Sequence, residues 1–123
     1  MTSEERDGFR LTLISEAIVD LQRRLHNMKE QSFLADRDEQ ALTAFRLSIV
    51  AENANRLSDG VKARYPAIPW KAMAGFRNIV AHEYHLVDAE RSWEALATLP
   101  VIAAMAEAEL SRLRIEGRGP RGE

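Results

Sequence analysis

The sequence contains no cysteine, which excludes disulfide bonds, thiolate metal ligands and cysteine nucleophiles. The absence of cysteine also fits a reducing compartment. No apolar run approaches the roughly 18 residues that a membrane span needs. The first seven residues are charged and are followed by an amphipathic pattern, which is unlike a signal peptide. We therefore expect a cytoplasmic protein with no membrane partner.

A basic excess is also lacking, because the formal net charge is −2. A protein that coats nucleic acid without sequence preference would carry a clear positive charge. Yet 14 of the 17 basic residues are arginine, whose planar fork binds phosphate and carboxylate groups. A local anion-binding site is therefore compatible with the weak overall charge.

The N-terminal half has the apolar spacing of two helices. The first is predicted over about residues 3 to 29, with Thr2 and Glu5 as a capping box and a polar break at residues 31–32. Its apolar residues recur at alternating spacings of four and three: Ile14, Ile18, Leu21, Leu25 and Met28. A second helix is predicted after Asp36, with Glu39 as its capping partner. The apolar stripe assigned to this helix comprises Leu42, Phe45, Ile49 and Leu57.

Polar residues interrupt the second stripe, namely Glu52, Asn53 and Asn55. Residues of this kind beside a core are either half-exposed or hydrogen-bonded inside it. We expect the helix to stop at residues 58–60 and a short helical turn to follow. The two prolines within residues 65–69 then exclude a regular helix in that segment.

The C-terminal half predicts further helices in the same domain. Pro69 suits the first position of a helix from about Trp70 through Arg77. Asp88 is a suitable N-cap for the next helix, which carries Trp93 and Leu96, and Pro100 should kink or restart it before residues 101–113. No strand pattern, repeat or domain linker is present. We predict an all-α antiparallel bundle of four to five helices over residues 1–115, with residues 116–123 as a disordered tail.

Most motifs of known catalytic chemistry are missing. The sequence has no Gly-rich phosphate loop, no His-Glu-x-x-His motif and no serine nucleophile elbow. His82 and His85 could share a helix face near Glu83 and Asp88, but they have no clear third ligand. We therefore predict no metal ion and no other cofactor.

The most informative segment is residues 77–84, Arg-Asn-Ile-Val-Ala-His-Glu-Tyr. On a helix, an apolar stripe of Met73, Phe76, Ile79 and Val80 faces the bundle. Arg77 and Tyr84 lie on one flank, and Asn78 and His82 point toward the opposite side. Glu83 falls within the apolar stripe, which predicts that the helix bends or ends near His82 or that Glu83 has a buried partner.

This segment resembles the Arg-x4–6-His-x-Tyr signature of HEPN domains, in particular of HepT toxins. The matching residues are Arg77, His82 and Tyr84, with Asn78 after the arginine. Further similarities fall between Glu52 and Pro100, about half of the chain: Ile68-Pro69-Trp70, Ala74-Gly75-Phe76-Arg77-Asn78, Val87-Asp88 and Trp93. The N-terminal helix is similar in pattern only. Ala51-Glu52-Asn53 departs from the family's more frequent Gly-Glu-Ala but keeps the glutamate.

The resemblance implies a homodimer whose two motifs meet at the interface. It implies a metal-independent RNA endonuclease, the toxin of a type II or type VII-like toxin–antitoxin pair. It also implies a minimal nucleotidyltransferase as antitoxin, which adds AMP to Tyr84. The residues fit this chemistry, since His82 can move a proton, Arg77 can bind the phosphate and Asn78 can orient His82. Arg77 and His82 diverge by about 140° around a helix, which favours a cleft shared by two chains.

Other interpretations of the same residues remain open. The alternative function is a non-catalytic HEPN subunit that binds substrate for a nucleotidyltransferase, although the intact Arg-Asn-His set favours the enzyme. Tyr84 could be a packing residue with its hydroxyl at the rim. We interpret Glu52 as a buried partner for an arginine rather than a catalytic acid. Trp70 and Trp93 are expected to anchor the core.

Overall fold

Every regular element of the described chain is helical. The structure is a computed structural model that describes residues 1–82 and 88–118, and the side chains of residues 1–78 and 88–114. The elements are α1 (Ser3–Leu25), α2 (Glu30–Leu34), α3 (Arg37–Asn55), α4 (Asp59–Arg64), α5 (Trp70–His82), α6 (Ala89–Ala95), the 3₁₀ turn η2 (Leu96–Thr98) and α7 (Leu99–Arg118). The predicted all-α class is confirmed.

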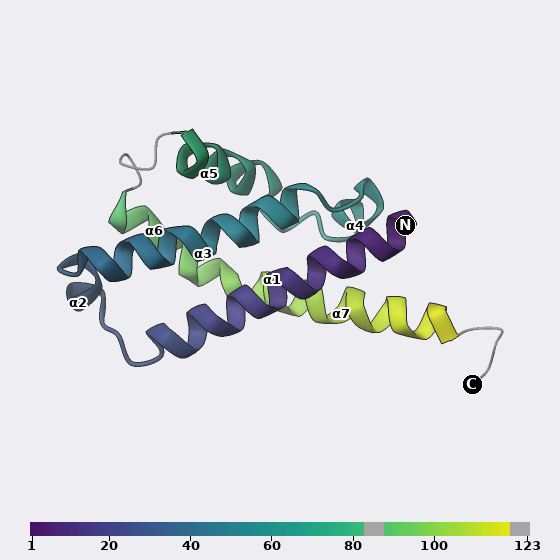
Figure 1. Cartoon of the computed structure of the whole chain (residues 1–123), viewed down its shortest axis with the longest axis horizontal. Helices are drawn as coiled ribbons and strands as arrows, with labels where there is room; N and C mark the ends of the chain where they lie inside the picture. The colour runs from purple at the N-terminus through teal and green to yellow at the C-terminus, as the bar shows by residue number, and fades with distance from the viewer. Residues whose placement is uncertain (83–87, 119–123) are drawn as a thin grey trace.

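The long helices α1, α3 and α7 form the bundle, and α5 covers one side of it. Helix α1 packs against both α3 and α7, while α5 packs along α3 (Figure 1). The chain reverses direction between α1 and α3, so the N-terminal half of α1 lies near the C-terminal end of α3 (Figure 1). No helix among the described residues is long and apolar enough to cross a membrane.

The helix starts follow from side-chain caps. Thr2 accepts a hydrogen bond from the Glu5 N–H in a complete capping box, as predicted. Asp36 caps α3 through the Glu39 N–H, but the Glu39 carboxylate pairs with Arg24 of α1 instead of completing a capping box. Ser58 caps the short helix α4, which confirms the expected helical turn. Asp88 caps α6, also as predicted.

The core lies between α1, α3 and α7. Its large buried side chains come mainly from these three helices: Leu11, Ile14, Ile18, Leu21, Leu47, Val50, Leu99, Ile102 and Met105. The rings of Phe33 and Trp93 pack against each other with centroids 5.2 Å apart and join α2 to α6. Trp70 packs against the core while its indole N–H donates to the Tyr65 carbonyl at 3.0 Å. Both tryptophans therefore anchor the bundle, as predicted.

The predicted stripe of the second helix is correct only in part, because Leu57 is buried in the core and Ile49 packs against the core. Phe45 is 59% exposed, and Leu42 and Ile49 are only half-buried. The buried face of α3 instead contains Leu47 and Val50 together with small residues: Thr43, Ala44, Ala51, Asn53 and Ala54. Small side chains let α3 approach α1 and α5 closely on two sides, and a search for large apolar residues does not detect such a face.

Three helix boundaries also differ from prediction. The first helix ends at Leu25, four residues early, because a turn is needed before α2 folds back toward α3. The predicted polar break at residues 31–32 lies inside α2. Helix α7 continues to Arg118 and so includes three residues assigned to the tail. The remaining tail, residues 119–123, lies outside the described residues.

Candidate functional site

Arg77 lies on α5 and reaches across to α3. Its Nε donates to Oε2 of Glu52, and its Nη1 donates to Oδ1 of Asn78 at 2.8 Å. The Arg77 side chain remains 32% exposed. The first two residues of the predicted motif, Arg77 and Asn78, are thus bound to each other and attached to a neighbouring helix.

The packing of α5 places Arg77 in this position. Met73 and Phe76 are half-buried and pack against the core, which fixes the inner face of the helix as predicted. Arg77 follows Phe76 and therefore falls on the flank that borders α3. Asn78 is exposed. Buried Ile68 joins the same core cluster and fixes the start of the helix.

Glu52 connects two arginines at this site. Its Oε1 forms an ion pair with Nε of Arg56 at 2.8 Å, while Oε2 accepts from Arg77. The hydrogen bond from Arg77 lowers the pKa of the Glu52 carboxyl, and Arg56 acts in the same direction while partial burial opposes it. Glu52 is therefore ionised near neutral pH. The prediction that Glu52 partners an arginine is confirmed, although the side chain is 33% exposed rather than fully buried.

Two arginines at the site were not expected from the sequence. Arg56 is the C-cap of α3 and follows Glu52 by one helical turn, a spacing at which such pairs form. Arg10 of α1 donates from Nη1 to Oδ1 of Asn53 at 3.4 Å. Asn53 is buried and donates to the Ile49 carbonyl. Three arginines from three helices therefore meet the neighbouring residues Glu52 and Asn53.

The second half of the motif is described less fully. Helix α5 is described as far as His82, and the predicted bend, end or buried partner of Glu83 lies outside the described residues. The side chain of His82, and the whole of Glu83, Tyr84 and His85, lie outside the described residues. The structure therefore brings Arg77 and Asn78 together and leaves the roles of His82 and Tyr84 as predictions.

Comparison with known proteins gives one consistent result. A protein-family model described as "Ribonuclease HepT-like" matches residues 14–109. "Probable ribonuclease HepT" of Thermococcus cleftensis is 29% identical over 83 residues, which are 68% of this chain and 76% of that protein. A Methanocaldococcus jannaschii protein named "Putative RNase" is 29% identical over 69 residues, which are 56% of this chain and 57% of that protein. No solved structure gave a significant match.

Proposed function

This chain belongs to the HepT-like ribonuclease family, and on that premise we propose that it is a metal-independent RNA endonuclease. We further propose that it acts as the toxin of a toxin–antitoxin pair. The observation that carries the proposal is a half-exposed arginine, Arg77, fixed beside Asn78 on the same helix as His82. Arginine, asparagine and histidine together supply what cleavage by the RNA's own hydroxyl requires.

In the proposed reaction the RNA supplies its own nucleophile. His82 removes the proton from a ribose 2′-hydroxyl, and the 2′ oxygen attacks the adjacent phosphorus. The Arg77 guanidinium stabilises the charge that grows on the non-bridging oxygens. The bond to the 5′ oxygen breaks, and that oxygen takes up a proton from His82 or from water. The products are a 2′,3′-cyclic phosphate and a 5′-hydroxyl.

We propose that two copies share the cleft. Arg77 and His82 diverge by about 140° around one helix, so a second chain makes their convergence on one phosphate easier. An exposed apolar surface supports this arrangement, because Phe45 lies two turns before Glu52 on the same line of α3. Sedimentation should show a dimer that Phe45→Ser weakens and that Val101→Ser, at a similarly exposed position on α7, leaves intact. A dimer unaffected by Phe45→Ser would place the interface elsewhere.

Cleavage in the presence of excess chelator is the direct test of the reaction. Wild-type protein should cut RNA without a divalent ion and leave a 2′,3′-cyclic phosphate. Arg77→Ala and His82→Ala should each abolish cleavage and growth inhibition while the protein stays helical and dimeric, because neither residue lies on the apolar stripe. Activity that disappears with chelator and returns with a divalent ion would contradict the mechanism. Loss of folding in either variant would return the motif to a structural role.

A second candidate is a non-catalytic subunit that binds substrate for a nucleotidyltransferase. It is supported by the engagement of Arg77 with both Glu52 and Asn78, since a guanidinium held by protein groups can be purely structural. Expression of this chain alone separates the two candidates. Growth arrest that depends on His82 supports the toxin, whereas harmless expression with no RNA cleavage supports the binding subunit.

We propose that an antitoxin of the nucleotidyltransferase type silences the protein at Tyr84. The Tyr84 phenol oxygen would attack the α-phosphate of ATP, form a phosphodiester with AMP and release pyrophosphate and a proton. On a continuous helix Tyr84 would lie about 20° from Arg77, so the added phosphate could pair with Arg77 and occupy the place of the RNA phosphate.

Intact-mass measurement after incubation with the partner, ATP and magnesium tests this modification. Wild type should gain mass in steps of one AMP, and Tyr84→Phe should gain none. Equal gain in both proteins, or inhibition with no gain in either, would reject Tyr84 as the target.

A further inference from the structure

Glu52 holds two guanidinium groups side by side at the surface. Arg56 and Arg77 each approach it through Nε, and each uses a different carboxylate oxygen. The two guanidinium groups therefore cannot lie farther apart than the width of one carboxylate plus two short contacts. They come from different segments, the C-cap of α3 and helix α5, so Glu52 sets their spacing.

Both arginines keep guanidinium N–H donors that form no hydrogen bond with the described residues. Among the described side chains, no protein partner contacts the Nη atoms of Arg56 or the Nη2 of Arg77. The Arg56 side chain is 53% exposed. Two arginines against one glutamate leave a net positive charge, and guanidinium N–H groups form strong bidentate contacts with phosphate oxygens.

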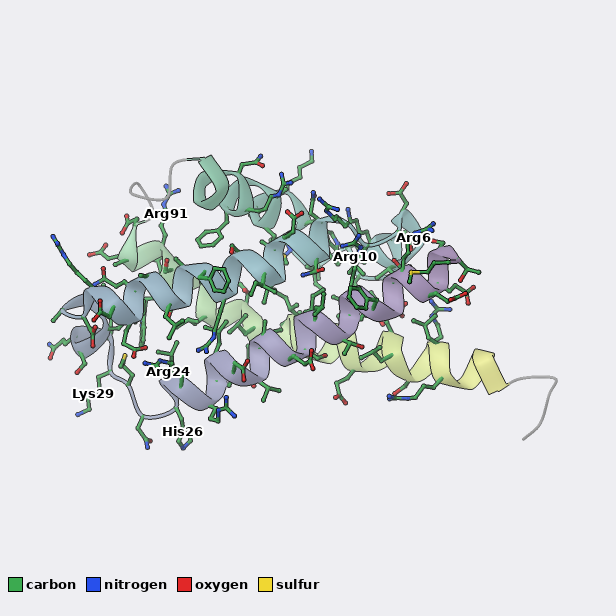
Figure 2. All side chains as sticks on the ribbon, viewed as in Figure 1. Arg6, Arg10, Arg24, His26, Lys29 and Arg91 are labelled. Carbon is green, nitrogen blue, oxygen red and sulfur yellow. The ribbon has the colours of Figure 1, made fainter. Side chains whose placement is uncertain are left out.

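A third arginine, on α1, lies close to this pair. Arg10 contacts Asn53, the residue after Glu52, and so lies beside the same turn of α3. Figure 2 shows Arg6 and Arg10 on the N-terminal half of α1, at the end of the molecule where α3 ends and α4 lies. Arg24, His26 and Lys29 lie at the opposite end (Figure 2). Arg10, Arg56 and Arg77 therefore lie around one turn of α3, in a chain whose net charge is −2.

We propose that Arg56 is a second RNA-binding residue, held beside Arg77 by Glu52 so that the two arginines clamp neighbouring phosphates of one RNA strand. This proposal deepens the proposed endonuclease function and rests on it. Arg77 would contact the phosphate that reacts, and Arg56 would hold the backbone next to it. Arg10 extends the same surface toward α1. Glu52 is then a positioning residue, which orients the cations without touching RNA.

A simpler explanation of the Arg56 contact has to be tested against this one. Glu52 and Arg56 are four residues apart on one helix, and such pairs commonly stabilise exposed helices slightly. Under that explanation Arg56 contributes to α3 and nothing to RNA affinity. The chain offers a matched control in Arg23, which forms a similar ion pair with Asp20 at 2.8 Å and is 75% exposed. Arg23 lies roughly 20 Å from Arg10 along α1.

Binding of a fluorescent 2′-O-methyl oligonucleotide separates the two explanations, because this probe lacks the 2′-hydroxyl needed for cleavage. Arg56→Gln should weaken binding about three- to tenfold and reduce the slope of log K against log salt by about 0.7. Arg56→Lys should recover part of the affinity, since it restores the charge without the fork. Arg23→Gln should match the wild type. All variants should have wild-type helicity.

Each result decides the proposal. Wild-type affinity and salt slope in Arg56→Gln would reject the clamp, as would an equal loss in Arg23→Gln or a wild type that binds no probe. The endonuclease function is judged separately on natural RNA. Binding that depends on Arg56 in a protein that never cleaves RNA would keep the clamp and reject the endonuclease. RNA cleavage with a KM that Arg56→Gln does not change would keep the endonuclease and reject the clamp.

Discussion

Two glutamates in this protein are each held by two arginines, and they differ in depth. Glu109 of α7 is 2% exposed and accepts hydrogen bonds from Arg64, from Arg112 and from the Tyr65 hydroxyl, the last at 3.0 Å. Glu52 of α3 is 33% exposed and contacts Arg56 through one carboxylate oxygen and Arg77 through the other. The same pair of residue types therefore neutralises a buried charge in one place and holds two partly exposed arginines together in the other.

The pKa values follow the same contrast. Burial acts to raise the pKa of the Glu109 carboxyl, but the hydrogen bonds from Arg64, Arg112 and Tyr65 outweigh it and lower the pKa to about 2. Burial, together with the bond to Glu109, raises the pKa of the Tyr65 hydroxyl. At Glu52, the bond from Arg77 lowers the pKa against weaker desolvation. The Glu109 cluster thus stabilises the fold, while the Glu52 cluster has donors available for a ligand.

The largest predicted effect is the loss of stability when the arginine partners of a glutamate are replaced by alanine. Arg64→Ala with Arg112→Ala should leave a buried carboxylate without its cations and cost about 3–5 kcal/mol of the free energy of unfolding. Arg56→Ala with Arg77→Ala should cost about 1 kcal/mol or less, because water solvates Glu52. Urea unfolding followed by circular dichroism, at one fixed protein concentration, measures both.

A third substitution tests why the Arg64/Arg112 double variant loses more of its free energy of unfolding. Adding Glu109→Met to the first double variant removes the unpaired charge and keeps most of the volume, so stability should partly return. Equal losses of stability in the two double variants, or no recovery of stability with Glu109→Met, would show that the burial of the glutamate does not distinguish the two clusters.

Lowering the pH should also distinguish Glu109 from Glu52, and the expected change in stability is intermediate in size. The folded pKa of Glu109, about 2, lies below its ordinary value of 4.5. Its contribution to stability is therefore complete above about pH 4.5 and is lost as pH falls toward 2, and the shift corresponds to about 3 kcal/mol. Glu109→Gln should flatten the fall in urea midpoint between about pH 5 and 2.5, whereas Glu52→Gln should change it much less. A wild-type midpoint that stays constant over this range would contradict the assignment.

The sequence predicted the fold well where a single helix determines the pattern. The stripe on α1, the caps at Thr2, Asp36 and Asp88, and the restart at Pro100 depend on local spacing and local hydrogen bonds. The buried face of α3 was not predicted correctly, because α3 packs against helices on two sides through small residues. Periodicity of large apolar residues detects a one-sided helix and fails for a central one.

The candidate site was predictable in part for the same reason. Arg77 and Asn78 were found from their pattern within one segment. The spacing of Glu52 and Arg56 by one turn is also a local signal. The contact between Glu52 and Arg77 spans 25 positions and two helices, so no spacing rule specifies it. Only the packing of α5 on α3 brings the two arginines to one carboxylate.

The smallest predicted change in stability is the one that most directly tests the function of Glu52. Glu52→Gln keeps the size of the side chain but removes its charge. Its interactions with Arg56 and Arg77 should therefore weaken. The repulsion between residue 52 and the RNA phosphates should also fall. Unfolding free energy should change by less than about 1 kcal/mol, since the residue is half-exposed. Cleavage kinetics should show kcat about three- to tenfold lower with KM unchanged or reduced, because the arginines are less well positioned but the site is more positive. Arg56→Gln should do the reverse and mainly raise KM. Two outcomes would contradict this prediction. A Glu52→Gln protein with wild-type kcat would show that Glu52 forms an ordinary surface ion pair. A Glu52→Gln protein as unstable as the Arg64/Arg112 double variant would show that Glu52 is a structural residue like Glu109.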